Sequence, residues 1–447
     1  MLSLSMIGFA TILIIVLLLI SGRVAPIIAL VLVPILGAFA AGFGLEAIGG
    51  FFDEGIVSVI NVVIMFIFAI LFFGIMQDVG LFDPLINKLI AISRGNVIAI
   101  SVGSVLIAAV AQLDGSGAST FLITIPALLP LYKRLKMNPY LLLLLIGGSA
   151  SIMNMLPWAG PLGRSASVLG MDVTELWRPL IPVQIIGMVL LIGLAVFLGY
   201  MEQRRICKRY GSTEAAAAIE PEPDEQQEDE KMEQSAKDTS LARPKMLWIN
   251  TILAIGVIGI LVWGIIPAGL AFMIGVSIAL PINYPNMKDQ MDRIKAHAPN
   301  ALMMATIILA AGSFLGILTG TGMLDSIAED IVKVLPAFVA PYLHLIIGFF
   351  GVPFDLLLST DAYYFALLPV VDQIASSFGI ASLSTAYAMI IGNIVGTFVS
   401  PFSPALWLAL GLAGLEMGRH IRYSLLWMWG ISIVLLAVAL LIGVITI

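Results

Sequence analysis

The sequence is poor in the residues on which many soluble enzymes depend. It has one cysteine, Cys207, and three histidines among 447 residues, and only 11% of its residues are charged. A single cysteine excludes an intramolecular disulfide. The sequence also lacks the HExxH, GxSxG and P-loop motifs. Nothing in it therefore supports an enzyme, an ATP-driven pump or a bound cofactor.

The scarcity of charge is matched by an excess of apolar residues. Sixty per cent of the residues are hydrophobic and the mean hydropathy is +1.06, which leaves too little polar surface to cover a soluble domain. Several windows exceed the roughly 20 apolar residues that are needed to cross a bilayer. The first, residues 4–20, is followed at once by a second span without a signal-peptide cleavage pattern, so we expect it to be retained.

The net charge of −6 comes from one segment, residues 211–243. This segment is acidic, contains proline and has few apolar residues, which is typical of a disordered linker. The rest of the chain is close to neutral, and we expect no nucleic-acid partner. We predict two membrane units, residues 1–210 and 244–447, joined by a cytoplasmic linker.

The second unit repeats the first. Residues 156–161 align with 400–405, and residues 80–85 align with 322–327, so that proline, glycine and single charges recur at matching places in apolar segments. Broken hydrophobic segments at corresponding positions of two halves indicate the midplane site of a secondary transporter.

We predict an all-α polytopic membrane protein with five crossings in each unit, among them residues 56–77 in the first and 301–320 in the second. Each unit also contains a re-entrant helical hairpin, at 97–132 or 339–371, and a broken crossing, at 140–170 or 385–414. Because five is odd, the second unit must be inverted. All but three of the 22 lysines and arginines then fall on the linker side, which places both termini outside the cell.

Charged residues at membrane depth are costly, about 2.5–3.5 kcal/mol each on insertion scales, and are therefore candidates for function. Asp114 and Asp361 lie at the two hairpin tips, Asp355 one turn before the second tip, and Arg164 just after the first break. Side chains at such tips cap helices. A buried carboxylate can also exchange a proton or ligate a metal, and both interpretations can hold together. Arg164 could bind a carboxylate or extend to the outer interface.

Polar residues gather around the same tips and breaks, where free N–H groups attract anions, although each alone is more often a packing contact between helices. The predicted substrate-binding residues are Ser116, Gly117, Ser119, Asn154, Pro157, Gly160, Arg164, Ser359, Thr360, Thr397, Ser400 and Ser403. The candidates for proton coupling or metal binding are Asp114, Asp355 and Asp361.

These motifs resemble the bacterial citrate-metal ion:proton symporter family. The resemblance rests on residues 113–120, 154–161, 359–364, 400–404 and 418–424, and covers the chain apart from the linker. It implies uptake of citrate complexed with a divalent cation such as Mg²⁺ or Ca²⁺, together with protons, through the bacterial cytoplasmic membrane. It also implies a homodimer and an elevator mechanism. Related sodium-coupled carriers have Ser-Asn-Thr at their tips, whereas this chain has Asp114 and Asp361.

Charge supports a metal complex as the substrate. Citrate carries three negative charges, whereas its complex with one divalent cation carries one, so less charge must be desolvated. A sodium-coupled di- or tricarboxylate carrier and an ion-conducting channel remain as alternatives.

Overall fold

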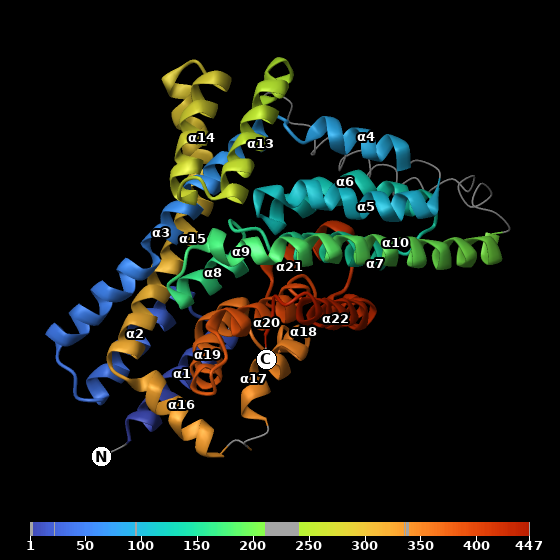
Figure 1. Ribbon diagram of the computed structural model, residues 1–447. Coiled ribbons are helices and arrows are strands. Elements are labelled where there is room, and N and C mark those ends of the chain that lie inside the picture. The colour runs from blue at the N-terminus through green and yellow to red at the C-terminus, as the bar shows by residue number, and fades with distance from the viewer. Residues whose placement is uncertain are drawn as a thin grey trace.

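The structure is a computed structural model that describes residues 3–21, 23–93, 96–210, 241–334, 336 and 339–446. Every regular element in these ranges is a helix (Figure 1). The predicted all-α fold is therefore confirmed. The predicted linker, residues 211–243, lies outside the described residues except for its last three positions, and the division into two units and a linker stays a prediction.

The first unit contains the elements α1 (Leu4–Ser21), α2 (Pro26–Ala40), α3 (Leu45–Asp78), α4 (Asp83–Ser93), α5 (Val97–Ala111), η1 (Gln112–Asp114), α6 (Gly117–Arg134), α7 (Pro139–Met153), α8 (Gly160–Leu169), α9 (Val173–Trp177), η2 (Arg178–Leu180) and α10 (Ile181–Tyr210). The second contains η4 (Pro244–Met246), α13 (Leu247–Trp263), α14 (Ala268–Asn283), α15 (Met287–Gly320), α16 (Met323–Val334), η5 (Ala340–Tyr342), α17 (Leu343–Phe349), α18 (Gly351–Phe354), η6 (Ala362–Leu367), α19 (Leu368–Ser377), α20 (Ser382–Ile394), α21 (Pro404–Ala413) and α22 (Met417–Leu441).

The repeat read from the sequence reappears in helix lengths and helix ends. Helices α3 and α15 each have 34 residues, and α8 and α21 each have 10. Gly80 and its counterpart Gly322 have φ of 76° and 71°, and Gly170 and Gly414 have φ of 62° and 65°. Because this left-handed backbone favours glycine, the same residue ends equivalent helices in both units.

Helices α3 and α15 pack closely against each other where they cross. A Cβ atom at Gly55 or Gly312 would collide with backbone of the facing helix, so glycine permits the crossing. Both helices begin earlier than the sequence indicated, at Leu45 instead of residue 56 and at Met287 instead of residue 301. Charged residues marked these stretches as loops, yet the helices continue through them.

The two hairpins differ in regularity. In the first, α5 and η1 together run for 18 residues, long enough by length and composition to cross a bilayer, so re-entrancy stays a prediction. In the second, the first arm divides at Phe350 into α17 and α18, and the second arm starts with the π-helix η6. π-Helical turns are rare and occur frequently at functional sites.

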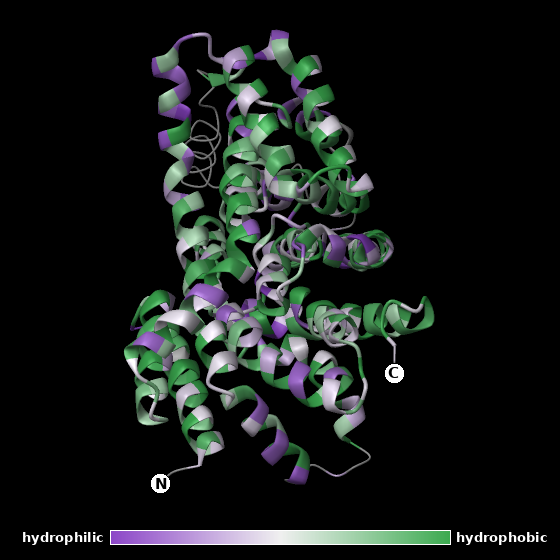
Figure 2. Cartoon of the chain, turned by 60° about the vertical axis from the view of Figure 1, so that its left-hand side comes forward, coloured by the Kyte–Doolittle hydropathy of each residue, from purple (hydrophilic) through white to green (hydrophobic). Residues whose placement is uncertain are grey.

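The surface agrees with a membrane protein. Six helices among the described residues are long and apolar enough to span a bilayer, and further apolar helices are shorter. Large apolar side chains such as Leu36, Ile255 and Trp263 are exposed. Figure 2 shows hydrophobic residues over most helices, with hydrophilic residues at the upper and lower ends of the view and at mid-height.

Candidate functional site

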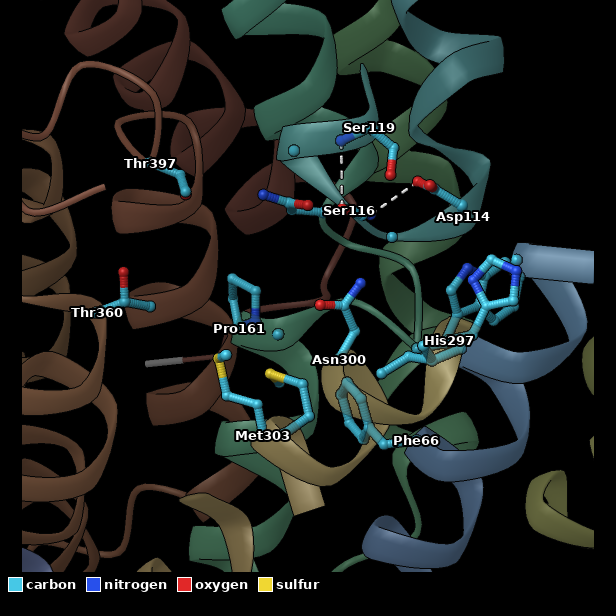
Figure 3. Close-up of a pocket in the computed structure, with 18 of the residues that line it drawn as sticks. Phe66, Asp114, Ser116, Ser119, Pro161, His297, Asn300, Met303, Thr360 and Thr397 are labelled. Atoms are coloured by element: carbon cyan, nitrogen blue, oxygen red, sulfur yellow. Dashed lines mark hydrogen bonds between the residues drawn. The ribbon is translucent and has the colours of Figure 1, made fainter. Parts of the chain in front are cut away.

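A cavity of about 300 Å³ lies where the first hairpin tip, both helix breaks and the α3–α15 pair meet. It is lined by Phe66, Ile70, Gly74, Gln77, Asp114, Gly115, Ser116, Gly117, Ser119, Asn154, Trp158, Gly160, Pro161, Arg164, His297, Asn300, Met303, Met304, Thr360, Thr397 and Phe398. In Figure 3 the tip residues Asp114, Ser116 and Ser119 lie on one side of this cavity. His297, Asn300 and Met303 lie on another, and both units therefore contribute to it.

Local hydrogen bonds fix the conformation of the first hairpin tip. Gly115 has a left-handed backbone with φ of 75°, which turns the chain between η1 and α6. The N–H of Ser116 donates to Oδ1 of Asp114 at 2.8 Å, and Oγ of Ser116 accepts from the N–H of Ser119 at 3.4 Å (Figure 3). Ser116 is thus the N-cap of α6, and Asp114, only 9% exposed, lines the cavity.

Below the tip, a neutral side-chain network joins the hairpin to the first broken helix. Nε2 of Gln112 donates to Oδ1 of Asn154 at 2.8 Å, and Oγ1 of Thr120 donates to Oε1 of Gln112 at 2.6 Å. All three residues are buried. Because a buried polar group without a partner costs about 1–3 kcal/mol, this network fixes the tip against the break.

Proline and glycine interrupt both broken helices beside the cavity. Helix α7 ends at Met153, and α8 begins at Gly160 with Pro161 in its first turn. Nε1 of Trp158, between them, donates to the carbonyl of Leu113 at 2.8 Å. The first residues of α8, Gly160 and Pro161, line the cavity, and the N-terminus of a helix favours anions.

Arg164 forms an ion pair that the sequence did not reveal. Its Nε donates to Oδ1 of Asp361 at 2.7 Å, and the side chains are only 12% and 15% exposed. The guanidinium also lies over the ring of Phe365, 5.9 Å from its centroid. Arg164 thus turns inward and does not extend to the interface. Its charge is offset by Asp361, which does not line the cavity.

The structure brings most of the predicted site residues together. Those that line the cavity are Asp114, Ser116, Gly117, Ser119, Asn154, Gly160, Arg164, Thr360 and Thr397. Those that do not are Pro157, Ser359, Ser400, Ser403, Asp355 and Asp361. Oγ of Ser359 accepts from the N–H of Ala362 at 3.2 Å, as an N-cap, and Oγ of Ser400 donates to the carbonyl of Asp355 at 2.6 Å.

The sequence missed one wall of the cavity, contributed by α3 and α15. Its residues include Phe66, Gln77, His297 and Asn300. Nε2 of His297 lies 2.8 Å from Oδ2 of Asp78, whose second contact is Arg293 at 3.4 Å. The polar residues His297 and Asn300 lie on either side of Pro299, in a helix that becomes apolar, and this pattern was the available signal. The prediction that the crossing begins at residue 301 left both residues outside the membrane.

Comparison with known proteins agrees with this architecture. A family model described as "Citrate transporter" matches residues 5–392. A curated citrate transporter of Bacillus subtilis (strain 168) is 37% identical over 443 residues, which cover 99% of this chain and all of the relative. A Mg(2+)/citrate complex secondary transporter of the same organism is 37% identical over 449 residues, 99% of each chain.

The chain belongs to the citrate transporter family. The family resemblance seen in the sequence is thereby confirmed, and the protein is a multi-pass membrane transporter and not an enzyme. The solved structure of the YdaH transporter of Alcanivorax borkumensis matches 90% of this chain and 90% of its own, with a TM-score of 0.59 and 17% identity. That likeness supports the fold alone.

Proposed function

We propose that this protein is a secondary active transporter that takes up citrate as a divalent metal complex, in symport with protons, across the bacterial cytoplasmic membrane. The observation that carries the proposal is the charge of the cavity. Its lining combines the carboxylate of Asp114 with Arg164, whose charge is already offset by Asp361. A named Mg(2+)/citrate transporter among the relatives supports the same substrate.

This charge pattern disfavours free citrate. A trianion would meet the Asp114 carboxylate without an unpaired arginine to offset it, and like charges in a poorly hydrated site repel strongly. A citrate complex carries its own divalent cation, which can face Asp114 while its carboxylates face the donors. Oxygen ligands of this kind suit Mg²⁺ and Ca²⁺.

The neutral donors of the cavity match the oxygens of citrate. Hydroxyls come from Ser116, Ser119 and Thr360, and an amide comes from Asn300, whereas the Thr397 hydroxyl already donates to the carbonyl of Ile394. Arg164 uses Nε for Asp361 and retains its other N–H groups for one substrate carboxylate. Hydrogen bonds to charged groups contribute about 1.5–3 kcal/mol each, so a few of them suffice for specific binding.

The arrangement of the cavity supports an elevator mechanism. The hairpin tip and helix breaks form one side, and the glycine-rich α3–α15 crossing forms another. Movement of the first set relative to the second would carry the site across the bilayer. We further propose a homodimer with both termini outside and the linker in the cytoplasm, as the positive-inside rule favours.

Uptake of radiolabelled citrate into proteoliposomes tests the proposal. We expect uptake to require both an inward proton gradient and a divalent cation, and to stop with a chelator. Uptake that is driven by sodium and indifferent to the metal would instead support a sodium-coupled carrier. Conductance far above carrier turnover, without saturation by substrate, would indicate a channel.

The variant Asp114→Asn tests the role of the cavity carboxylate. The change keeps the shape of the side chain and the acceptor for the Ser116 N–H, but removes the charge that would face the metal. We expect weaker binding of Mg²⁺-citrate and less discrimination against free citrate. Unchanged preference for the metal complex would contradict the assignment of Asp114.

A further inference from the structure

Asp355 is a deeply buried carboxylate that lies outside the cavity. It follows α18 in the first arm of the second hairpin, and is 1% exposed. Its Oδ2 has no hydrogen-bond partner among the described residues. An ionised carboxylate in this position would cost several kcal/mol, because burial removes its hydration and it forms no ion pair among the described residues. A proton or another cation must therefore neutralise the carboxylate.

The repeat shows what a purely structural residue would look like at this position. Ser116 and Ser359 cap the second arms of their hairpins, each accepting from the N–H three residues later. Counted back four residues from these caps, Gln112 in the first hairpin corresponds to Asp355 in the second. Gln112 is neutral and hydrogen-bonded through both side-chain polar atoms. Asp355 replaces that amide with an acid whose Oδ2 has no hydrogen-bond partner among the described residues.

Crowding around Oδ2 decides which cation fits. A Cβ atom at Gly396 would collide with Oδ2, so the carboxylate packs directly against backbone at the end of α20. A divalent metal ion needs about six oxygen ligands at about 2.0–2.6 Å. The neighbouring groups are the Asn393 amide and the Ser400 hydroxyl, and the latter already donates to the Asp355 carbonyl. A proton needs no such shell.

Two buried tyrosines of the π-helix η6 lie near Asp355. The hydroxyl of Tyr364 has no hydrogen-bond partner among the described residues, and the hydroxyl of Tyr363 donates to the carbonyl of Met389. The groups that face Asp355 are thus Asn393 from α20 and the two tyrosines from η6.

We propose that Asp355 is the residue that carries the coupling proton. This inference rests on the proposed proton symport and names its site. One proton from outside binds the Asp355 carboxylate to give the neutral acid, crosses with it, and leaves to the cytoplasm. The cavity residue Asp114 then faces the metal of the substrate, so proton and metal occupy different carboxylates.

The variants Asp355→Asn and Asp355→Glu test this proposal in proteoliposomes. Asparagine mimics the protonated acid, so we expect at least a tenfold loss of uptake driven by a proton gradient. Exchange of labelled Mg²⁺-citrate for internal Mg²⁺-citrate, which needs no net proton movement, should stay within threefold of wild type and lose its pH dependence. The matched control is Asp372→Asn, a half-buried acid in α19, the helix that follows η6, which should keep coupled uptake.

The outcomes separate this inference from the proposed function. If the wild-type protein does not take up Mg²⁺-citrate, the proposed function fails. If it does and Asp355→Asn still accumulates substrate on a proton gradient, only the assignment of Asp355 fails. If Asp355→Asn has lost Mg²⁺-citrate binding, Asp355→Glu is the deciding variant. Coupled uptake by Asp355→Glu with a shifted pH profile supports the assignment of Asp355, and loss of coupled uptake by this variant overturns it.

Discussion

Variants of the ion pair between Arg164 and Asp361 should affect the stability of the protein and its binding of substrate differently. The pair joins α8 of the first unit to the second hairpin, and its members are 197 residues apart in the sequence. Arg164 lines the cavity and Asp361 does not. The single variants Arg164→Gln and Asp361→Asn and the double variant therefore test two roles of one side chain.

The structure gives the expected size of each effect. Removal of one member of a buried ion pair costs about 3–5 kcal/mol, and we expect the lower end because the side chains retain 12% and 15% exposure. Arg164→Gln should thus lower the free energy of unfolding by about 3 kcal/mol. The double variant replaces the ion pair with two neutral amides, and should recover most of this loss.

Binding should not recover in the double variant. If Arg164 donates to a substrate carboxylate, its loss removes a hydrogen bond to a charged group, about 1.5–3 kcal/mol. That range corresponds to an increase of about 10- to 150-fold in the Kd for Mg²⁺-citrate. Both Arg164→Gln and the double variant should show it. Arg164→Lys should fall between them and wild type, since lysine keeps the charge without the planar fork.

Thermal unfolding in detergent measures the first effect, and equilibrium binding of labelled Mg²⁺-citrate to the purified protein measures the second. A double variant that recovers both stability and affinity would show that Arg164 acts only as a partner for Asp361. Unfolding of Arg164→Gln at the wild-type temperature would refute the stabilising role of the ion pair, because the partly buried Asp361 carboxylate would then need no partner.

Further predictions concern the helix crossing, the caps and the missed wall. Gly312→Ala should destabilise the protein by about 1–3 kcal/mol in thermal unfolding, because its Cβ collides with α3, whereas Gly256→Ala, with open space around it, should not. An equal response of the two glycines would contradict the close crossing. Ser359→Ala should cost about 0.5–2 kcal/mol of stability through loss of the cap, and should leave the Kd for Mg²⁺-citrate unchanged. A raised Kd would make Ser359 a ligand after all. His297→Gln and Asn300→Ala should each raise the Kd several-fold with little change in unfolding temperature, and a wild-type Kd in both would remove α15 from the site.

The repeated architecture was predictable because backbone requirements leave a local signature. Glycine at Gly80 and Gly170, and proline just after each helix break, recur at their counterparts because equivalent turns need the same residues. The extents of α3 and α15 were not predictable in this way. Hydropathy reports where a helix leaves the membrane, and not where it ends, so polar helical extensions were read as loops.

The site was predictable only where it lies on irregular backbone. Glycine, proline and single charged residues within apolar segments indicate the hairpin tips and helix breaks. The wall residues Phe66 and Asn300 lie within regular helices and reach the cavity only because α3 and α15 cross there. The pairing of Arg164 with Asp361 likewise depends on tertiary structure. Arg164 alone would make this part of the site positive, and Asp361 neutralises it.

A symmetric backbone thus carries an asymmetric set of charges. Each charged residue of the site corresponds to an uncharged residue in the other unit: Asp114 to Leu357, Arg164 to Leu408, Asp355 to Gln112 and Asp361 to Ala118. Because every charge at membrane depth costs about 2.5–3.5 kcal/mol, a second full set would be costly without a second substrate. One cavity carboxylate, one arginine with its partner and one separate acid are what the proposed transport of a single metal complex with a proton requires. In the proposed elevator movement, the two units of the inverted repeat would give access to that one site from opposite sides of the membrane.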